Sequence, residues 1–211
     1  MTRSGRVLVL KHHVERAPFL REVFALRLWQ GLPEVPRLVA APDYAGRTFL
    51  IEHLPEPVDL DQRKNLVGAA QSLGTLHAVA ALKLGRREPT AAPSSAGVAS
   101  SGATERRDPT GEVLLREDLR GAGTRVTIGD RKHEHFRWRA GAIVTIDFES
   151  VLVGGLPLRD LVELVYGGHE VGTDLPFAEV ATAYCQGRGA ATKQRYPAQR
   201  LAGWLAEQIP S

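Results

Sequence analysis

Short apolar runs alternate with helical repeats along the first part of the chain. Residues 6–11 form an apolar run that ends in a lysine, and the runs at 36–40 and 48–52 are similar, so three strands are predicted. Between the first two runs, residues 17–31 place apolar side chains on two faces of a helix. Residues 62–84 repeat apolar side chains every three or four positions, which predicts a long helix with closely packed alanines.

The rest of the chain divides into three stretches of different character. Residues 86–111 are rich in Ala, Ser, Gly, Pro, Thr and Arg without periodicity, which predicts a flexible insertion. Residues 124–130 and 142–147 each predict a strand that ends in an aspartate. Residues 158–209 carry helical patterns, with prolines near two expected helix starts.

Composition and charge narrow the class of protein. The 211 residues are 43% hydrophobic and 24% charged, which is typical of a globular protein, and no apolar run approaches the roughly 20 residues of a membrane helix. A single cysteine, Cys185, cannot form an internal disulfide, so we expect a reducing, cytoplasmic compartment. The net charge of +3 is spread among 24 acidic residues, so neither a nucleic-acid partner nor a membrane partner is expected.

Two aspartates carry the chemical argument. Asp130 and Asp147 each follow an apolar strand, and if those strands pair, both carboxylates emerge at one sheet edge. One carboxylate there can accept a proton from a hydroxyl group, and the other can hold a divalent cation bound to phosphates. Phosphoryl transfer needs this arrangement, because its catalysis consists mostly of positioning groups and neutralising charge.

These segments resemble those of a known family. Gly129-Asp130 and Asp147-Phe148-Glu149 resemble the catalytic and metal-binding loops of the aminoglycoside phosphotransferase-like branch of the protein-kinase-like superfamily. The other matching landmarks stand in the family's order: Lys11, Glu22, Val35–Leu38, Leu50–Leu54, Leu73–Ala78 and Leu158–Leu161. The likeness spans roughly residues 6–165.

The resemblance implies an α+β, two-lobed kinase-like fold. A reduced N-lobe, residues 1–54, would hold a small, incomplete antiparallel sheet, and a mainly helical C-lobe would cover residues 55–211. The implied activity is an ATP-dependent phosphotransferase, a kinase, that acts on a hydroxyl of a small molecule. Its implied cofactors are ATP and Mg²⁺, with Mn²⁺ as the alternative ion.

The resemblance also implies a nucleotide site. Lys11 would contact a phosphate and be held in place by an ion pair with Glu22. Glu52, His53 and Leu54 would form the hinge that contacts the nucleotide base through backbone groups.

On the catalytic side, the resemblance makes Asp130 the catalytic base and Asp147 a metal ligand. Lys132 corresponds to a lysine near the transferred phosphate, although a solvated loop lysine is an equal interpretation. Asp160 would brace the catalytic loop, and His135 stands where the family has a metal-binding asparagine.

Departures from the family pattern leave a second function open. Only Arg3-Ser-Gly5 stands where a glycine-rich turn is expected, Ile128 replaces a histidine, and His135 replaces the asparagine. Since Mg²⁺ prefers oxygen ligands, an imidazole weakens one metal position. The alternative is therefore a catalytically impaired, kinase-like binding or scaffold protein.

Several residues have other interpretations. His133 and His135 flank Glu134 in a pattern that suits zinc, but further ligands at a recognisable spacing are lacking. Glu15 is a rival ion-pair partner for Lys11. A further set has no assigned chemistry: Cys185 is expected to be a small buried residue, the tryptophans packing residues, and His12 and His13 surface residues.

Overall fold

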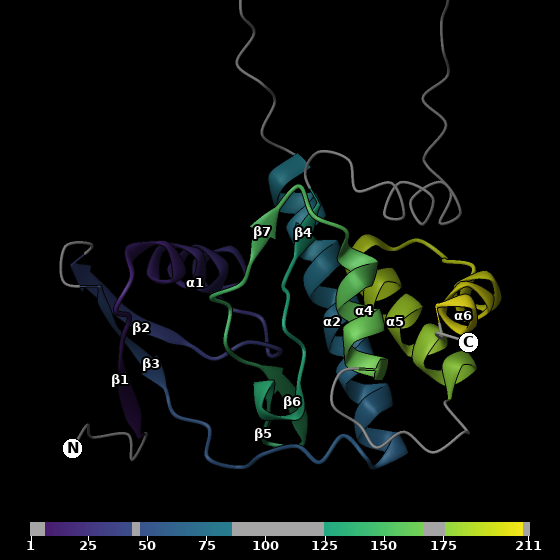
Figure 1. Cartoon of the computed structure of the whole chain (residues 1–211), viewed down its shortest axis with the longest axis horizontal. Coiled ribbons are helices and arrows are strands. Elements are labelled where there is room, and N and C mark those ends of the chain that lie inside the picture. Colours follow the sequence, from purple (N-terminus) through teal and green to yellow (C-terminus); the bar gives the residue numbers. More distant parts are fainter. Residues whose placement is uncertain (1–6, 44–46, 86–124, 167–175, 209–211) are drawn as a thin grey trace, which may run out of the picture.

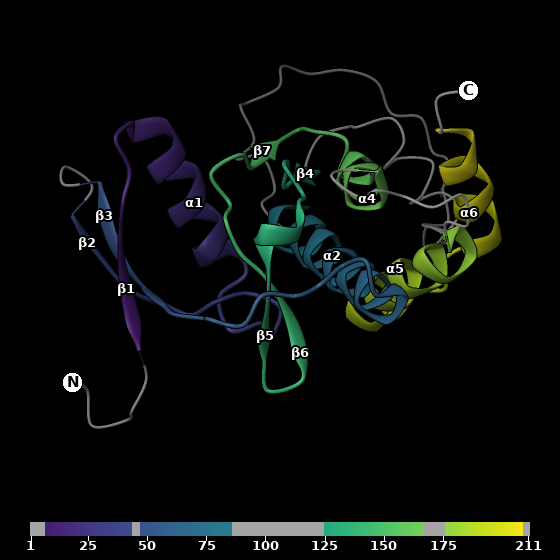
Figure 2. The same ribbon diagram turned by 60° about the horizontal axis from the view of Figure 1, so that its bottom comes forward.

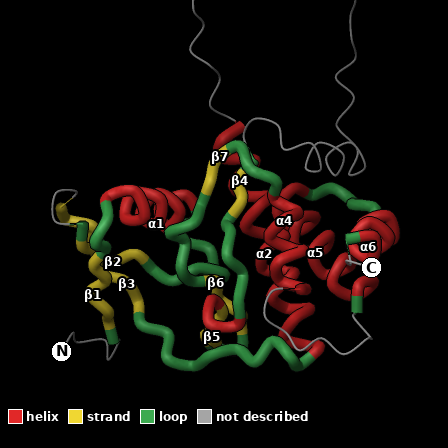
Figure 3. The backbone as a smooth tube through the Cα atoms, viewed as in Figure 1, coloured by secondary structure: helices red, strands yellow, loops and turns green. Residues whose placement is uncertain are grey.

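The computed structural model describes residues 7–43, 47–85, 125–166 and 176–208. The insertion predicted at 86–111 lies outside these ranges. The described residues form an α+β structure, as predicted, with strands on one side and most helices on the other (Figure 3).

The N-terminal part is a small antiparallel sheet with one helix packed on it. The strands β1 (Leu8–His12), β2 (Leu38–Asp43) and β3 (Thr48–Glu52) pair in the order β1-β3-β2. All three were predicted, and β3 lies in the centre, pairing Phe49 with Lys11 of β1. Helix α1 (Arg16–Leu28) runs alongside the sheet (Figure 1).

Helix α1 is buried on two faces, as its pattern predicts. Phe19, Val23 and Leu26 are inaccessible or nearly so, and so is Glu22 on the same helix. The indole of Trp29, just past the helix, donates a hydrogen bond from Nε1 to the backbone oxygen of Leu76, 2.8 Å away. The end of α1 is therefore fixed against the helical part of the molecule.

Most of the remaining described residues are helical. Its elements are α2 (Arg63–Gly85), β4 (Val126–Thr127), the 3-10 turn η1 (His133–His135), β5 (Phe136–Arg139), β6 (Ala142–Thr145), β7 (Leu152–Val153), α4 (Pro157–Tyr166), α5 (Phe177–Thr192) and α6 (Ala198–Glu207). Helix α2, predicted at 62–84, is the central helix, with α4 and α5 beside it (Figures 1 and 2). In the described part of the chain, no helix has the length and apolar character needed to span a membrane.

The pairing expected between the two aspartate-bearing strands is wrong. β4 pairs with β7, and β6 pairs with β5 in a separate hairpin that projects from the molecule in Figure 2. The reason is local: Ala140 and Gly141 both adopt positive φ, the conformation of a two-residue hairpin turn, so β6 pairs with its neighbour in sequence. The loops that follow β4 and β6 nevertheless come together, through contacts described below.

Candidate functional site

Lys11 joins the sheet, helix α1 and the loop after β6. Its Nζ lies 2.7 Å from Oε2 of Glu22 and 3.1 Å from Oδ1 of Asp147. The ion pair expected between Lys11 and Glu22 is therefore present, and the rival Glu15 lies instead at the exposed start of α1. Asp147, 136 residues further along the chain, is brought to the same ammonium group.

The charges around Lys11 stabilise one another. Burial alone would lower the pKa of Lys11, but the carboxylates of Glu22 and Asp147 outweigh it and raise that pKa above its ordinary value. Burial would likewise raise the pKa of Asp147, yet Lys11 and, more weakly, His135 and Arg131 hold it below its usual range. Both groups are thus charged at neutral pH.

His13 is a site residue that sequence analysis placed wrongly on the surface. Its ring is buried, stacks on Phe49 with centroids 5.9 Å apart, and places Nε2 2.8 Å from Oε2 of Glu22. Lys11 and His13 are two residues apart, so they lie on the same face of an extended chain, and both reach Glu22. This spacing was the available signal.

The loop that carries Asp130 has an unusual backbone. Gly129, Asp130 and Asp147 all have φ between 50° and 74°, a left-handed conformation that non-glycine residues rarely adopt. Such residues cluster at functional sites, where the surrounding structure holds them in place. The Asp130 carboxylate is exposed, and Oδ1 lies 3.0 Å from Nζ of Lys132. The hydrogen bond that the exposed Lys132 donates to Asp130 raises the pKa of Lys132.

Asp160 braces this loop from α4. Its fully buried carboxylate accepts hydrogen bonds from the backbone N–H groups of Ile128 (2.6 Å) and Gly129 (2.7 Å). Its Oδ2 also lies 2.8 Å from Nε2 of His77 on α2, and the other nitrogen of His77 lies 2.8 Å from the hydroxyl of Tyr184. Residues of α2, α4 and α5 are therefore hydrogen-bonded in a chain that reaches the loop, and the contacts agree with the bracing role predicted for Asp160.

Arg131 links the two aspartate loops and was not singled out from the sequence. Its buried guanidinium donates to the backbone oxygens of Gly129 (2.6 Å), Ile146 (3.3 Å) and Asp147 (2.7 Å). Burial lowers the pKa of Arg131, and Asp160, Asp147 and Asp130 oppose that effect. An arginine next to an aspartate is expected in solvent, so the sequence carries no signal of this role.

His135 lies between Asp130 and Asp147. Its Nδ1 is hydrogen-bonded to the backbone oxygen of Asp130, and its Nε2 lies 3.6 Å from Oδ2 of Asp147. The zinc interpretation of the His133 and His135 pair gains no support. Among the described residues, no group of three or more His, Cys, Asp or Glu side chains is arranged to hold a metal ion.

A cavity of about 280 Å³ adjoins this cluster. Val9, Ile51 and Ile146 supply apolar walls, and Lys11, Glu22 and Asp147 lie among its lining residues. The other lining residues are Pro36, Glu52, His53, Leu54 and Arg137. The predicted hinge and the predicted phosphate-binding lysine therefore border one cavity.

The hinge backbone is partly used by the sheet. The N–H of Glu52 donates to Arg37 and that of His53 donates to Val7, both at 3.0 Å, whereas the N–H of Leu54 has no partner among the described residues. The Glu52 carboxylate does not reach Lys11. It forms an ion pair with Arg139 at 2.8 Å.

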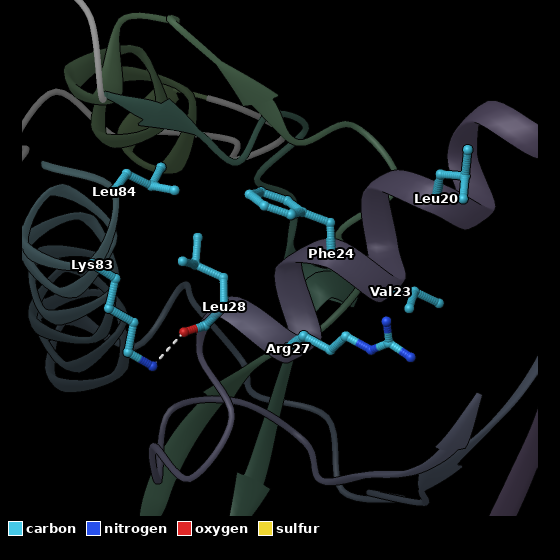
Figure 4. A pocket seen from close by; sticks show the side chains of 7 residues that line it. All are labelled: Leu20, Val23, Phe24, Arg27, Leu28, Lys83 and Leu84. Carbon is cyan, nitrogen blue, oxygen red and sulfur yellow. Dashed lines mark hydrogen bonds between the residues drawn. The ribbon is translucent and has the colours of Figure 1, made fainter. Parts of the chain in front are cut away.

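A second cavity, of about 460 Å³, lies between α1 and the end of α2. Figure 4 shows Phe24, Leu28 and Leu84 around it, and Lys83 donating to the backbone oxygen of Leu28. Among the described residues, its lining includes two cations and no carboxylate, so it offers neither a catalytic base nor an oxygen ligand for a metal.

Comparison with known proteins adds no assignment to this geometry: no protein-family model and no curated protein matches the chain.

Proposed function

We propose that the protein is an ATP-dependent phosphotransferase, a kinase with a two-lobed kinase-like fold, that acts on a hydroxyl group of a small molecule. The observation that carries the proposal is the position of Lys11. Its ammonium bridges Glu22 and Asp147 at a cavity whose walls are largely apolar. The purine base of a nucleotide needs apolar walls, and its polyphosphate needs a fixed cation beside those walls.

The cavity suits the nucleotide as follows. The nucleotide base would lie between Val9, Ile51 and Ile146, where the N–H of Leu54 is the donor left for it. The phosphates would then lie toward Lys11. Because Glu22 holds that ammonium in place, binding phosphate costs little reorganisation of the lysine.

Asp147 is the carboxylate proposed to hold the divalent cation. When bound, such a cation neutralises charge on the phosphates. Asp147 supplies the oxygen that Mg²⁺ prefers, whereas the neighbouring His135 supplies a nitrogen. The protein's own contribution is to fix Asp147 through Lys11 and through the hydrogen bond from Arg131 to its backbone oxygen.

Asp130 is the proposed catalytic base. Its carboxylate is exposed, so an incoming hydroxyl can reach it. It would accept the proton from that hydroxyl as the oxygen attacks the γ-phosphorus of ATP and the bond to the departing ADP breaks. Lys132, paired with Asp130, is the residue proposed to approach the transferred phosphoryl group. Asp160 and Arg131 act as positioning residues, because both hold the backbone of Gly129, the residue before Asp130.

One observation favours a second candidate function. The imidazole of His135 occupies the position where the resembled family has a metal-binding amide. A site that holds its metal weakly would fit a kinase-like binding or scaffold protein without useful turnover. Nucleotide binding and turnover must therefore be measured separately.

The first test is stabilisation by nucleotide. A ligand at 100 times its Kd stabilises the folded protein by about 2.7 kcal/mol, so ATP with Mg²⁺ or Mn²⁺ should raise the Tm by several degrees. Lys11→Met should remove this shift, whereas Lys64→Met, on the exposed side of α2, should retain it. No shift for the wild type with either metal would contradict nucleotide binding.

The second test is turnover. Asp130→Ala should bind ATP within about twofold of the wild type and lose at least 10²-fold in phosphoryl transfer to an alcohol acceptor or to water. A wild-type protein that binds ATP but transfers no phosphate in a screen of sugars and amino alcohols would favour the scaffold function.

A further inference from the structure

We propose that the cation position beside Asp147 takes a first-row transition-metal ion, with Nε2 of His135 as a direct ligand, in preference to Mg²⁺. The inference rests on the proposed function, because the phosphates of the nucleotide supply ligands that the protein does not. It goes beyond that function by naming the class of metal and the nitrogen that selects it.

The hydrogen bond of His135 fixes the tautomer that a metal needs. Its Nδ1 lies against the backbone oxygen of Asp130. A carbonyl oxygen only accepts hydrogen bonds, so Nδ1 carries a proton, and Nε2 is the nitrogen that can release its own proton and offer a lone pair to a metal. Metal-binding histidines commonly use this same arrangement, in which one nitrogen donates to a carbonyl oxygen and the other binds the metal.

Nε2 of His135 is the ring nitrogen near Asp147. Nε2 of His135 lies 3.6 Å from Oδ2 of Asp147, which exceeds the usual hydrogen-bond range. Two ligands that share one ion at bond lengths near 2.1 Å lie about 3.0–3.5 Å apart. The observed separation is thus close to that of two ligands of one ion.

The two carboxylate oxygens of Asp147 have different neighbours. Oδ1 faces Lys11 at 3.1 Å, which leaves Oδ2 on the side of His135. The imidazole is buried, so its ring is held in place without a metal. The site therefore offers one nitrogen and one oxygen whose orientation is already set.

The type of ligand decides the class of metal. Mg²⁺ takes oxygen ligands in a near-ideal octahedron, and imidazole suits transition-metal ions. Lys11 and Arg131 add positive charge near the position, so the protein alone should hold the ion weakly. We expect tight binding only with a nucleotide, whose phosphates neutralise that charge.

Mn²⁺ is the probe for the test, because its electron spin detects directly bound nitrogen. Pulsed electron paramagnetic resonance of the protein with Mn²⁺ and ATP should show coupling to ¹⁴N. His135→Asn, which offers an amide oxygen, should abolish that coupling, and His12→Asn, at an exposed ring hydrogen-bonded to Thr48, should retain it. The preference for Mn²⁺ over Mg²⁺ in nucleotide-dependent binding should fall at least tenfold in His135→Asn.

The outcomes separate this inference from the proposed function. If Mn²⁺ and ATP bind to the wild type without nitrogen coupling, the inference is overturned while the phosphotransferase proposal stands. If Mn²⁺ and ATP do not bind at all, both are overturned. Coupling that persists in a folded His135→Asn protein also overturns the inference, and His135→Gln provides a second variant if His135→Asn does not fold.

Discussion

At the scale of single residues, the site depends on the burial of Glu22. Its side chain is only 1% exposed, and a buried carboxylate is costly unless it is paired. Lys11 provides one partner at 2.7 Å and His13 another at 2.8 Å. The same pairing that satisfies Glu22 also fixes the ammonium beside Asp147, so stability and the proposed phosphate contact share one cause.

Lys11→Met should destabilise the protein in a pH-dependent way. At pH 7 the substitution leaves carboxylates short of a partner, and we expect a loss of about 1–3 kcal/mol in the free energy of unfolding. The pKa of Asp147 is lowered on folding, so its contribution is present at neutral pH and is lost as pH falls below about 4. The pKa of Lys11 is raised, so its contribution is lost only as pH rises above about 10.

Urea unfolding from pH 3 to pH 10 measures this profile. The difference between wild type and Lys11→Met should be constant from about pH 5 to pH 9 and shrink at the acidic end. Lys64→Met is the control and should stay within about 0.5 kcal/mol of the wild type. A difference that persists unchanged at pH 3 would show that the ion pair with Asp147 does not contribute.

Residues differ in how well the sequence identifies them. Lys11, Glu22, Asp147 and Asp160 were selected because their order and spacing resemble those of a known family, and the structure brings the first three together. Arg131 was missed, because burial of an arginine depends on carbonyl groups that tertiary packing supplies.

At the scale of elements, the packing of α2 against α5 helps to position the residues of the site. Both helices use glycine at their closest approach. A Cβ atom on Gly74 would lie 2.1 Å from the backbone oxygen of Tyr184, and one on Gly187 would lie 2.1 Å from that of Gln71. Since α2 also carries His77, which contacts Asp160, this packing positions the carboxylate that holds the loop before Asp130.

Gly74→Ala and Gly187→Ala should therefore each destabilise the protein. The added methyl group forces the two helices apart, at a cost of about 1–3 kcal/mol. Gly203→Ala on α6 is the matched control, because nothing lies within 4 Å of its added Cβ. There the better helix propensity of alanine should stabilise by about 0.5–1 kcal/mol. Thermal unfolding followed by circular dichroism measures all three, and equal effects at Gly74 and Gly203 would contradict the close approach.

Elements also show where prediction from sequence stops. The long helix α2 and the strands β1 to β3 were predicted, because their patterns are long or bounded by turn residues. The pairing of β4 with β7 was not, since these strands have two residues each and carry too little pattern to specify a partner. The two aspartate loops meet through Arg131 and His135 instead of through paired strands.

At the scale of the whole molecule, the sheet and the helices share one core. The buried side chains form a single cluster that runs from Phe19 and Phe49 to Tyr184 and Leu205. Trp29 lies within it, 5.2 Å from the ring of Phe148 and hydrogen-bonded to Leu76. The α+β class followed from the resemblance to a known family, but the continuity of this core did not, because the site joins segments more than a hundred residues apart.

A shared core predicts cooperative unfolding of the sheet and the helices. The chain has three tryptophans, so Trp138→Phe and Trp204→Phe together leave Trp29 as the only indole, a reporter for the end of α1. Because Trp29 is buried between α1 and α2, its fluorescence should change at the same urea concentration as the circular dichroism of the helices. If the fluorescence transition came first, the sheet with α1 would open independently. The ion pair between Lys11 and Asp147 would then have to form each time the two parts closed, in place of being preorganised as the proposed mechanism needs.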